Sequence, residues 1–132
     1  MLRLLLVITI LPAFFIACKQ NLNNSLVVTE EKNGSSVQLH KGDTFTVNLR
    51  GNPTTGYLWE AQMADSTVIR QNGDYEYHAD HTEPGYVGSP GMFTFRFTAV
   101  GKGQNDLQFI YHRPFEPDNP PEKTFRVTVI VK

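Results

Sequence analysis

The feature that most constrains the fold of this chain is the alternation of apolar and polar side chains. Phe93, Phe95 and Phe97 alternate with polar or charged residues, and the same period of two recurs along the sequence after residue 25. Successive side chains of a β-strand point to opposite faces, so this pattern predicts strands with one buried face. No stretch after residue 25 has the periodicity of an amphipathic helix of ordinary length. We therefore expect an all-β chain.

Turn residues divide the alternating sequence into short segments. They recur at intervals of roughly eight to fifteen positions, a spacing that is typical of a sandwich or a barrel, and periodicity alone does not choose between the two. Trp59 is expected in the core. Strands are predicted at residues 26–29, 37–39, 44–49, 58–63, 68–79 with a bend at Asn72-Gly73, 93–98, 107–111 and 125–131.

Length and composition narrow the class of protein. With 132 residues, 40% apolar and 19% charged, the chain is expected to form one globular domain. Its formal net charge of −1 gives no general attraction to nucleic acid or to an anionic membrane surface. The single cysteine is Cys18, so the region after it has no internal disulfide, no thiol nucleophile and no cysteine-based metal site. We expect a monomer without a cofactor.

The N-terminal residues are typical of an exported protein. Residues 1–17 are predicted to be a signal peptide. Arg3 comes before an uncharged, largely apolar run, and this run is too short to span a bilayer comfortably. The run ends at Phe15-Ile16-Ala17-Cys18, which resembles a bacterial lipobox. We expect a lipid on Cys18 that anchors the protein in the cell envelope, with soluble secretion as the alternative. Residues 18–25 would form a flexible tether, and residues 26–132 the folded domain.

A stiff loop is predicted between two of the strands, at Asn52-Pro53-Thr54-Thr55-Gly56-Tyr57. Pro53 fixes its own φ angle and pushes Asn52 toward an extended conformation. Gly56 permits a backbone angle that costs other residues energy. Two hydroxyl side chains, Thr54 and Thr55, stand at the tip of this loop.

Two further turn-prone segments stand beside predicted strands. They are Gly88-Ser89-Pro90-Gly91 and Arg113-Pro114-Phe115. Together with the first loop, and in this order, they resemble the chagasin family of cysteine-peptidase inhibitors, which carries NPTTGY/F, GxGG and RPW/F loops. The first motif matches in full, and the third matches in its Phe form. The second departs from the family pattern, because Pro90 stands at a position where the family has glycine and proline cannot adopt a positive φ.

The resemblance implies an immunoglobulin-like β-sandwich of about seven or eight antiparallel strands, with the three loops at one end. It also implies reversible, tight binding to a papain-like cysteine peptidase and no enzymatic activity. The first loop would enter the active-site cleft, with Thr54 and Thr55 near the catalytic cysteine of the peptidase. Arg113 and Phe115 would pack along the cleft wall, with Phe115 as an aromatic anchor.

Two other classes of function stay open at this point. A non-inhibitory immunoglobulin-like adhesion or carbohydrate-binding module would show exposed aromatic side chains on a strand, for which Tyr75 and Tyr77 are the candidates. A small hydrolase would bring an acid, a base and a nucleophile together from distant positions, which the sequence alone does not exclude.

One cluster has the side chains of a zinc site, namely His78, Asp80, His81 and Glu83. In an extended segment, His78 and Asp80 share one face while His81 and Glu83 share the other. The four side chains therefore cannot converge without a sharp bend, and we expect no metal site.

Overall fold

The computed structural model describes residues 25–63 and 65–132, and within them the chain is built from β-strands and two short 3-10 turns. The predicted signal peptide, Cys18 and nearly all of the predicted tether lie outside the described residues. No helix in the described part is long and apolar enough to cross a membrane. The elements are β1 (Leu26–Thr29), η1 (Glu30–Lys32), β2 (Ser36–Leu39), β3 (Thr44–Gly51), η2 (Pro53–Thr55), β4 (Leu58–Met63), β5 (Ile69–Gln71), β6 (Glu76–Ala79), β7 (Gly91–Ala99), β8 (Gly103–His112) and β9 (Lys123–Val131).

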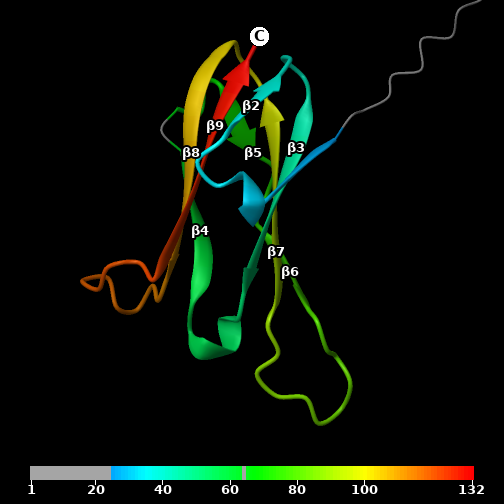
Figure 1. Ribbon diagram of the computed structural model, residues 1–132, viewed down its shortest axis with the longest axis vertical. Helices are drawn as coiled ribbons and strands as arrows, with labels where there is room; N and C mark the ends of the chain where they lie inside the picture. Colours follow the sequence, from blue (N-terminus) through cyan, green and yellow to red (C-terminus); the bar gives the residue numbers. More distant parts are fainter. Residues whose placement is uncertain (1–24, 64) are drawn as a thin grey trace, which may run out of the picture.

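The strands form two sheets packed face to face (Figure 1). The first sheet has the order β1-β3-β7, and both β5 and β6 pair with β7. The second sheet has the order β2-β9-β8-β4. The segment predicted as one bent strand at residues 68–79 is two short strands, because the chain leaves β7 after Gln71 and returns to it at Glu76.

The prediction that all strands are antiparallel is wrong at two places. β1 runs parallel to β3, and β2 runs parallel to β9. The chain crosses from the first sheet to the second between β1 and β2, and crosses back between β2 and β3. Each crossing reverses the direction of the chain, so β1 and β3 end up parallel. Counting β5 and β6 separately, the described residues hold nine strands instead of seven or eight.

The core lies between the inner faces of the two sheets, as the alternation predicts. Phe93, Phe95 and Phe97 are fully buried, and Trp59 is 2% exposed, so the prediction for Trp59 is confirmed. Phe95 of the first sheet packs edge to face on Phe109 of the second, with ring centroids 4.9 Å apart. Full burial of one such side chain stabilises the fold by about 1.5–3 kcal/mol. The packed core therefore fixes the positions of the strand ends from which the loops leave.

Three connections leave the end of the sandwich that is opposite the C-terminus; in Figure 1 the first two are at the bottom of the view, and the third projects to the lower left. Residues 52–57 cross from β3 in the first sheet to β4 in the second. Residues 80–90 close the β6–β7 hairpin of the first sheet, and residues 113–122 close the β8–β9 hairpin of the second. We call them the first, second and third loops. The crossing loop is thus flanked by one hairpin from each sheet.

Candidate functional site

The first loop has the stiff backbone that its sequence predicts. Asn52 is extended, with φ −134° and ψ 96°, and Pro53 opens the 3-10 turn η2. Gly56 ends the turn in the left-handed region at φ +82°, where a side chain would be strained. The N–H of Gly56 donates to the carbonyl of Pro53 at 3.0 Å, which closes the turn.

Asn52 ties this loop to the rest of the molecule. Its backbone N–H donates to the Tyr111 hydroxyl at 2.8 Å, and its Nδ2 donates to the Gly88 carbonyl at 2.9 Å. Its Oδ1 accepts from the Thr54 N–H at 3.2 Å and from the Thr54 hydroxyl at 2.5 Å. One side chain therefore caps the turn, joins the first loop to the second and leaves no polar atom of its own unpaired.

The two threonines at the tip are exposed, and their hydroxyls hold the loop together. The Thr54 hydroxyl donates to Asn52, as described above, and the Thr55 hydroxyl donates to the Asn52 carbonyl at 2.7 Å. Hydroxyls that are already committed in this way fix the shape of the tip, so the surface it presents is preformed.

The second loop accommodates Pro90 without strain. Among the described residues no residue other than glycine has a positive φ, and within this motif only Gly88 does, at +76°. Pro90 therefore keeps its ordinary φ, and its carbonyl accepts from the Asp80 N–H at 2.9 Å. The Ser89 carbonyl accepts from the Tyr77 hydroxyl at 2.9 Å. The neck of the loop is thus bonded to β6 and to the segment that follows β6.

Gly91 has a structural role inside the sheet. It is buried at the start of β7, between Gly51 of β3 and Ala79 of β6. A Cβ at this position would lie 2.2 Å from the His78 carbonyl oxygen. Any larger residue would force β6 away from β7, so Gly91 shapes the loop by letting the two strands approach.

The third loop leans on the first. Arg113 Nε donates to the Thr55 carbonyl at 3.2 Å, and the guanidinium carbon lies 4.5 Å from the centre of the Tyr57 ring. The Phe115 ring lies against Gly56, since a Cβ on that glycine would be 3.0 Å from the ring. Phe115 is nevertheless 68% exposed. Pro114, between them, is also exposed.

Some residues that fix the bases of the loops were not predicted from the sequence. Tyr111 lies in contact with both Tyr57 and Trp59, with ring centroids 5.3 Å and 5.0 Å apart, and its hydroxyl reaches Asn52. Alternation along β8 correctly places Tyr111 inward, but no local signal shows that its hydroxyl meets a loop from the other sheet. Arg50 of β3 and Asp80 at the start of the second loop likewise form an ion pair between distant parts of the sequence.

Every predicted loop residue is therefore brought to one end of the sandwich. An open groove of about 470 Å³ lies where the loops meet, and residues of all three loops line it. The lining loop residues are Asn52, Thr55, Tyr57, Pro90, Arg113 and Glu122.

The four residues considered for zinc point to different partners. His78 lies 3.6 Å from Glu76, and His81 lies 3.6 Å from Glu83 and stacks on Tyr86. Asp80 pairs with Arg50, and these hydrogen bonds lower the pKa of its carboxyl group below the usual value. Within the described residues, no three side chains of the kinds that bind metals come together.

The fold and this end of the molecule define a class of protein. A rigid β-sandwich that presents three interlocked, preformed loops is built to dock against the surface of another macromolecule. Its exposed aromatic, Phe115, follows Arg113 by two positions, and aromatic and arginine side chains are enriched at protein interfaces.

Comparison with known proteins shows the family. A family described as "Chagasin family peptidase inhibitor I42" matches residues 38–129, well over half of the chain. Amoebiasin-1 of Entamoeba histolytica is 34% identical over 105 residues, which span 80% of this chain and 98% of the relative. The chain belongs to the chagasin family of cysteine-peptidase inhibitors, which is a family of inhibitors and not of enzymes.

Solved structures agree on the fold. The cysteine protease inhibitor EhICP2 from Entamoeba histolytica superposes with a TM-score of 0.71 at 21% identity, over 81% of this chain and 95% of that one. PbICP-C, solved in complex with falcipain-2, superposes with a TM-score of 0.55 at 19% identity, over 83% and 92%. The predicted immunoglobulin-like β-sandwich is confirmed.

Proposed function

We propose that this protein is a reversible, tight-binding inhibitor of papain-like cysteine peptidases, and that its three loops together fill the active-site cleft. The observation that carries the proposal is the bonding between the loops. Asn52 joins the first loop to the second, and Arg113 joins the third loop to the first. A composite surface of this kind can fit one elongated groove without rearrangement.

The first loop would act as the wedge in the cleft. A peptidase cleaves a bond only when that bond reaches the geometry for attack by the catalytic thiol. Pro53, the 3-10 turn and the hydrogen-bonded hydroxyls of Thr54 and Thr55 hold the backbone in a turn, whereas a bound substrate is extended. The loop therefore occupies the cleft without offering a cleavable bond, and it loses little conformational entropy on docking.

The third loop would supply the main anchor. Phe115 is a large apolar side chain held out to solvent, and the contact with Gly56 fixes where it stands. Burial of such an aromatic in a partner is typical of an interface hot spot, for which truncation costs about 2 kcal/mol or more. Arg113 is largely committed to Thr55 and Tyr57, so its role is to set the third loop against the first.

The adhesion alternative predicted exposed aromatics on a strand face, and the two candidates do not form such a platform. Tyr77 is half-buried, and its hydroxyl is bonded to Ser89. Tyr75 is 37% exposed, but it lies just before β6 and packs against Phe93 and Phe95, with ring centroids 5.2 Å and 5.5 Å apart. Tyr77 therefore supports the second loop, and Tyr75 packs on the aromatic side chains of β7.

We further propose that the protein acts as an exported monomer anchored in the cell envelope through a lipid on Cys18. The support is the apolar run of residues 4–17 and the lipobox-like ending before this cysteine. Expression of the full chain in a bacterial host tests the anchor. Wild type should partition into detergent and Cys18→Ala should not, whereas equal partitioning of the two would exclude the lipid.

The inhibitory function is tested by titrating papain and a cathepsin L-type peptidase with residues 19–132. Wild type is compared with Thr55→Ala and Phe115→Ala. Val27→Ala serves as the control, because Val27 is a 52% exposed apolar side chain on β1, outside the three loops. We expect tight inhibition by wild type and the control, and weaker inhibition by both loop variants. Absence of inhibition by wild type at micromolar concentration would contradict the proposed function.

A further inference from the structure

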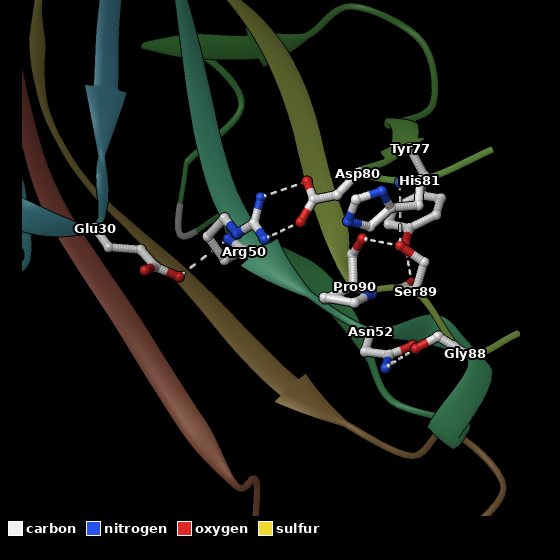
Figure 2. A network of polar contacts seen from close by, with 9 residues as sticks. All are labelled: Glu30, Arg50, Asn52, Tyr77, Asp80, His81, Gly88, Ser89 and Pro90. Atoms are coloured by element: carbon white, nitrogen blue, oxygen red, sulfur yellow. Dashed lines mark hydrogen bonds and ion pairs between the residues drawn. The ribbon is translucent and has the colours of Figure 1, made fainter. Parts of the chain in front are cut away.

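Figure 2 shows a chain of polar contacts that runs from the first sheet into the first and second loops, and three of its residues, Glu30, Arg50 and Asp80, lie outside the loop motifs. Arg50, the last residue but one of β3, is at the centre of these contacts. Both of its terminal nitrogens face the carboxylate oxygens of Asp80, with Nη1 and Oδ1 2.8 Å apart. Its backbone N–H donates to Glu30 Oε1 at 3.0 Å. We call Glu30, Arg50 and Asp80 the clasp.

The clasp joins the bases of two loops. Arg50 stands two positions before Asn52, and Asp80 is the first residue of the second loop. The Asp80 N–H donates to the carbonyl of Pro90, at the far end of the same loop. The carbonyl of Gly88 is in turn held by Asn52. The second loop is thus attached at two points, to Arg50 at the end of β3 and to Asn52 at the start of the first loop.

The second loop presents two large apolar side chains to solvent. Val87 is 95% exposed and Tyr86 is 61% exposed. The Tyr86 ring stacks on His81 with centroids 4.4 Å apart, and the His81 N–H donates to the Ser89 hydroxyl at 3.2 Å. The orientation of this apolar tip therefore depends on the residue next to Asp80. These two exposed apolar side chains stand next to the proposed interface and are free to contact a docked partner.

We propose that Arg50 and Asp80 are positioning residues for peptidase binding. Their ion pair sets the angle of the second loop relative to the first, and so holds Tyr86 and Val87 ready to contact the peptidase. The inference rests on the proposed inhibitory function, and it assigns affinity to two residues that do not belong to any loop motif. A surface ion pair contributes only a small part of the global stability, so its main effect at neutral pH should be found in binding. A loop that is already ordered loses less entropy when it docks.

The chain offers a matched control. Arg96 of β7 forms an ion pair of the same kind with Glu76, with Nη1–Oε1 at 2.8 Å and Nη2–Oε2 at 3.1 Å. This pair lies on the same sheet, and its arginine matches that of the clasp pair in exposure, with 48% of the Arg96 side chain and 46% of the Arg50 side chain accessible. The carboxylate partners differ, with 52% of Glu76 and 35% of Asp80 accessible. Glu76 begins β6, at the end of the strand that is remote from the second loop.

The experiment is a double-mutant cycle on Arg50→Gln and Asp80→Asn, with Arg96→Gln as the control. Inhibition constants against papain are measured together with amide hydrogen exchange of the free proteins and their thermal midpoints. We expect each clasp variant to raise the inhibition constant about fivefold to tenfold, and the double variant to raise it no further. The amides of Asp80 and His81 should exchange faster in these variants than in Arg96→Gln, at similar thermal midpoints.

Three results would overturn the positioning role. They are inhibition constants equal to that of the control, effects of the two substitutions that simply add, and a loss of affinity that follows the thermal midpoint. The proposed inhibitory function is tested separately, because it fails if wild type does not inhibit papain. In that case amide exchange of the free proteins still tests the positioning role, which is refuted if exchange is unchanged in the clasp variants. A Val87→Ala variant that inhibits as tightly as wild type would refute the part of the proposal that concerns the apolar tip.

Discussion

The backbone N–H of Asn52 donates to the hydroxyl of Tyr111 at 2.8 Å, although 59 positions separate the two residues. Tyr111 belongs to the second sheet, and Asn52 follows the last residue of β3 in the first. This bond holds the start of the first loop against the second sheet. A core side chain thereby determines where a loop at the surface begins.

Removal of that hydroxyl should cost both stability and affinity. Tyr111→Phe keeps the packing of the ring and leaves the partly buried Asn52 N–H without its acceptor. We expect a loss of about 1 kcal/mol in the free energy of unfolding, measured in urea, and weaker inhibition. Tyr75→Phe is the control, because the Tyr75 hydroxyl makes no hydrogen bond in the part of the chain that the structure describes. Equal stability of the two variants would contradict the role given to Tyr111.

The bond between the first and second loops can be broken without loss of the cap. Asn52→Asp retains an oxygen for the Thr54 N–H but replaces the Nδ2 donor with a second oxygen, which faces the Gly88 carbonyl. We expect weaker inhibition, with a stability loss of about 1–2 kcal/mol from the opposed oxygens. NMR shifts in the second loop, at Gly88 and Ser89, should change as well. Unchanged shifts there would show that the loops are independent.

A side chain at Gly91 should disrupt the hairpin that carries the second loop. In Gly91→Ala the new methyl group would collide with the His78 carbonyl, so β6 must move away from β7. Crowding of this kind typically costs about 1–3 kcal/mol. Thermal unfolding measures the loss, and hydrogen exchange along β6 locates it. A variant as stable as wild type would mean that the strands are further apart than described.

Acid should weaken the fold partly through the clasp. The hydrogen bonds from Arg50 lower the pKa of Asp80 from its usual 3.8, and those from Arg96 lower the pKa of Glu76 from 4.5. A carboxyl group whose pKa is lower in the folded state stabilises the fold above its unfolded pKa. That contribution is lost as the pH falls through the folded pKa. Thermal midpoints should therefore drop below about pH 4.

The variant Asp80→Asn isolates one of these two contributions. It cannot titrate at position 80, so its thermal midpoint should fall less steeply with acid than that of wild type. Circular dichroism melts between neutral pH and about pH 2.5 measure both slopes. Parallel slopes would show that the Asp80 carboxyl has the same pKa in the folded and unfolded chains.

The positions of the strands could be predicted from the sequence better than the way in which the strands pair. Alternation at Phe93, Phe95 and Phe97 located β7, because a strand with one buried face leaves a local signal. The parallel pairing of β1 with β3 left no such signal, since it depends on where the chain crosses between sheets. The stiffness of the first loop could also be predicted, because it depends on Pro53 and Gly56 within the loop itself.

Contacts that hold the site were less predictable than the site itself. The loop motifs could be located in the sequence because their residues are contiguous. The partners of those motifs are distant in the sequence: Tyr111 is 59 positions from Asn52, and Asp80 is 30 positions from Arg50. A charged residue on the outer face of a strand has the same local pattern whether it is solvated or paired. Only the three-dimensional arrangement separates the two cases.

The most direct test of the central claim is the kinetic mode of inhibition of papain by residues 19–132. Loops that occupy the active-site cleft exclude substrate, so the apparent inhibition constant should rise linearly with substrate concentration. The inhibitor should also be recovered with the segment from Asn52 to Tyr57 intact. An apparent constant that is independent of substrate, or cleavage within that segment during inhibition, would contradict the account.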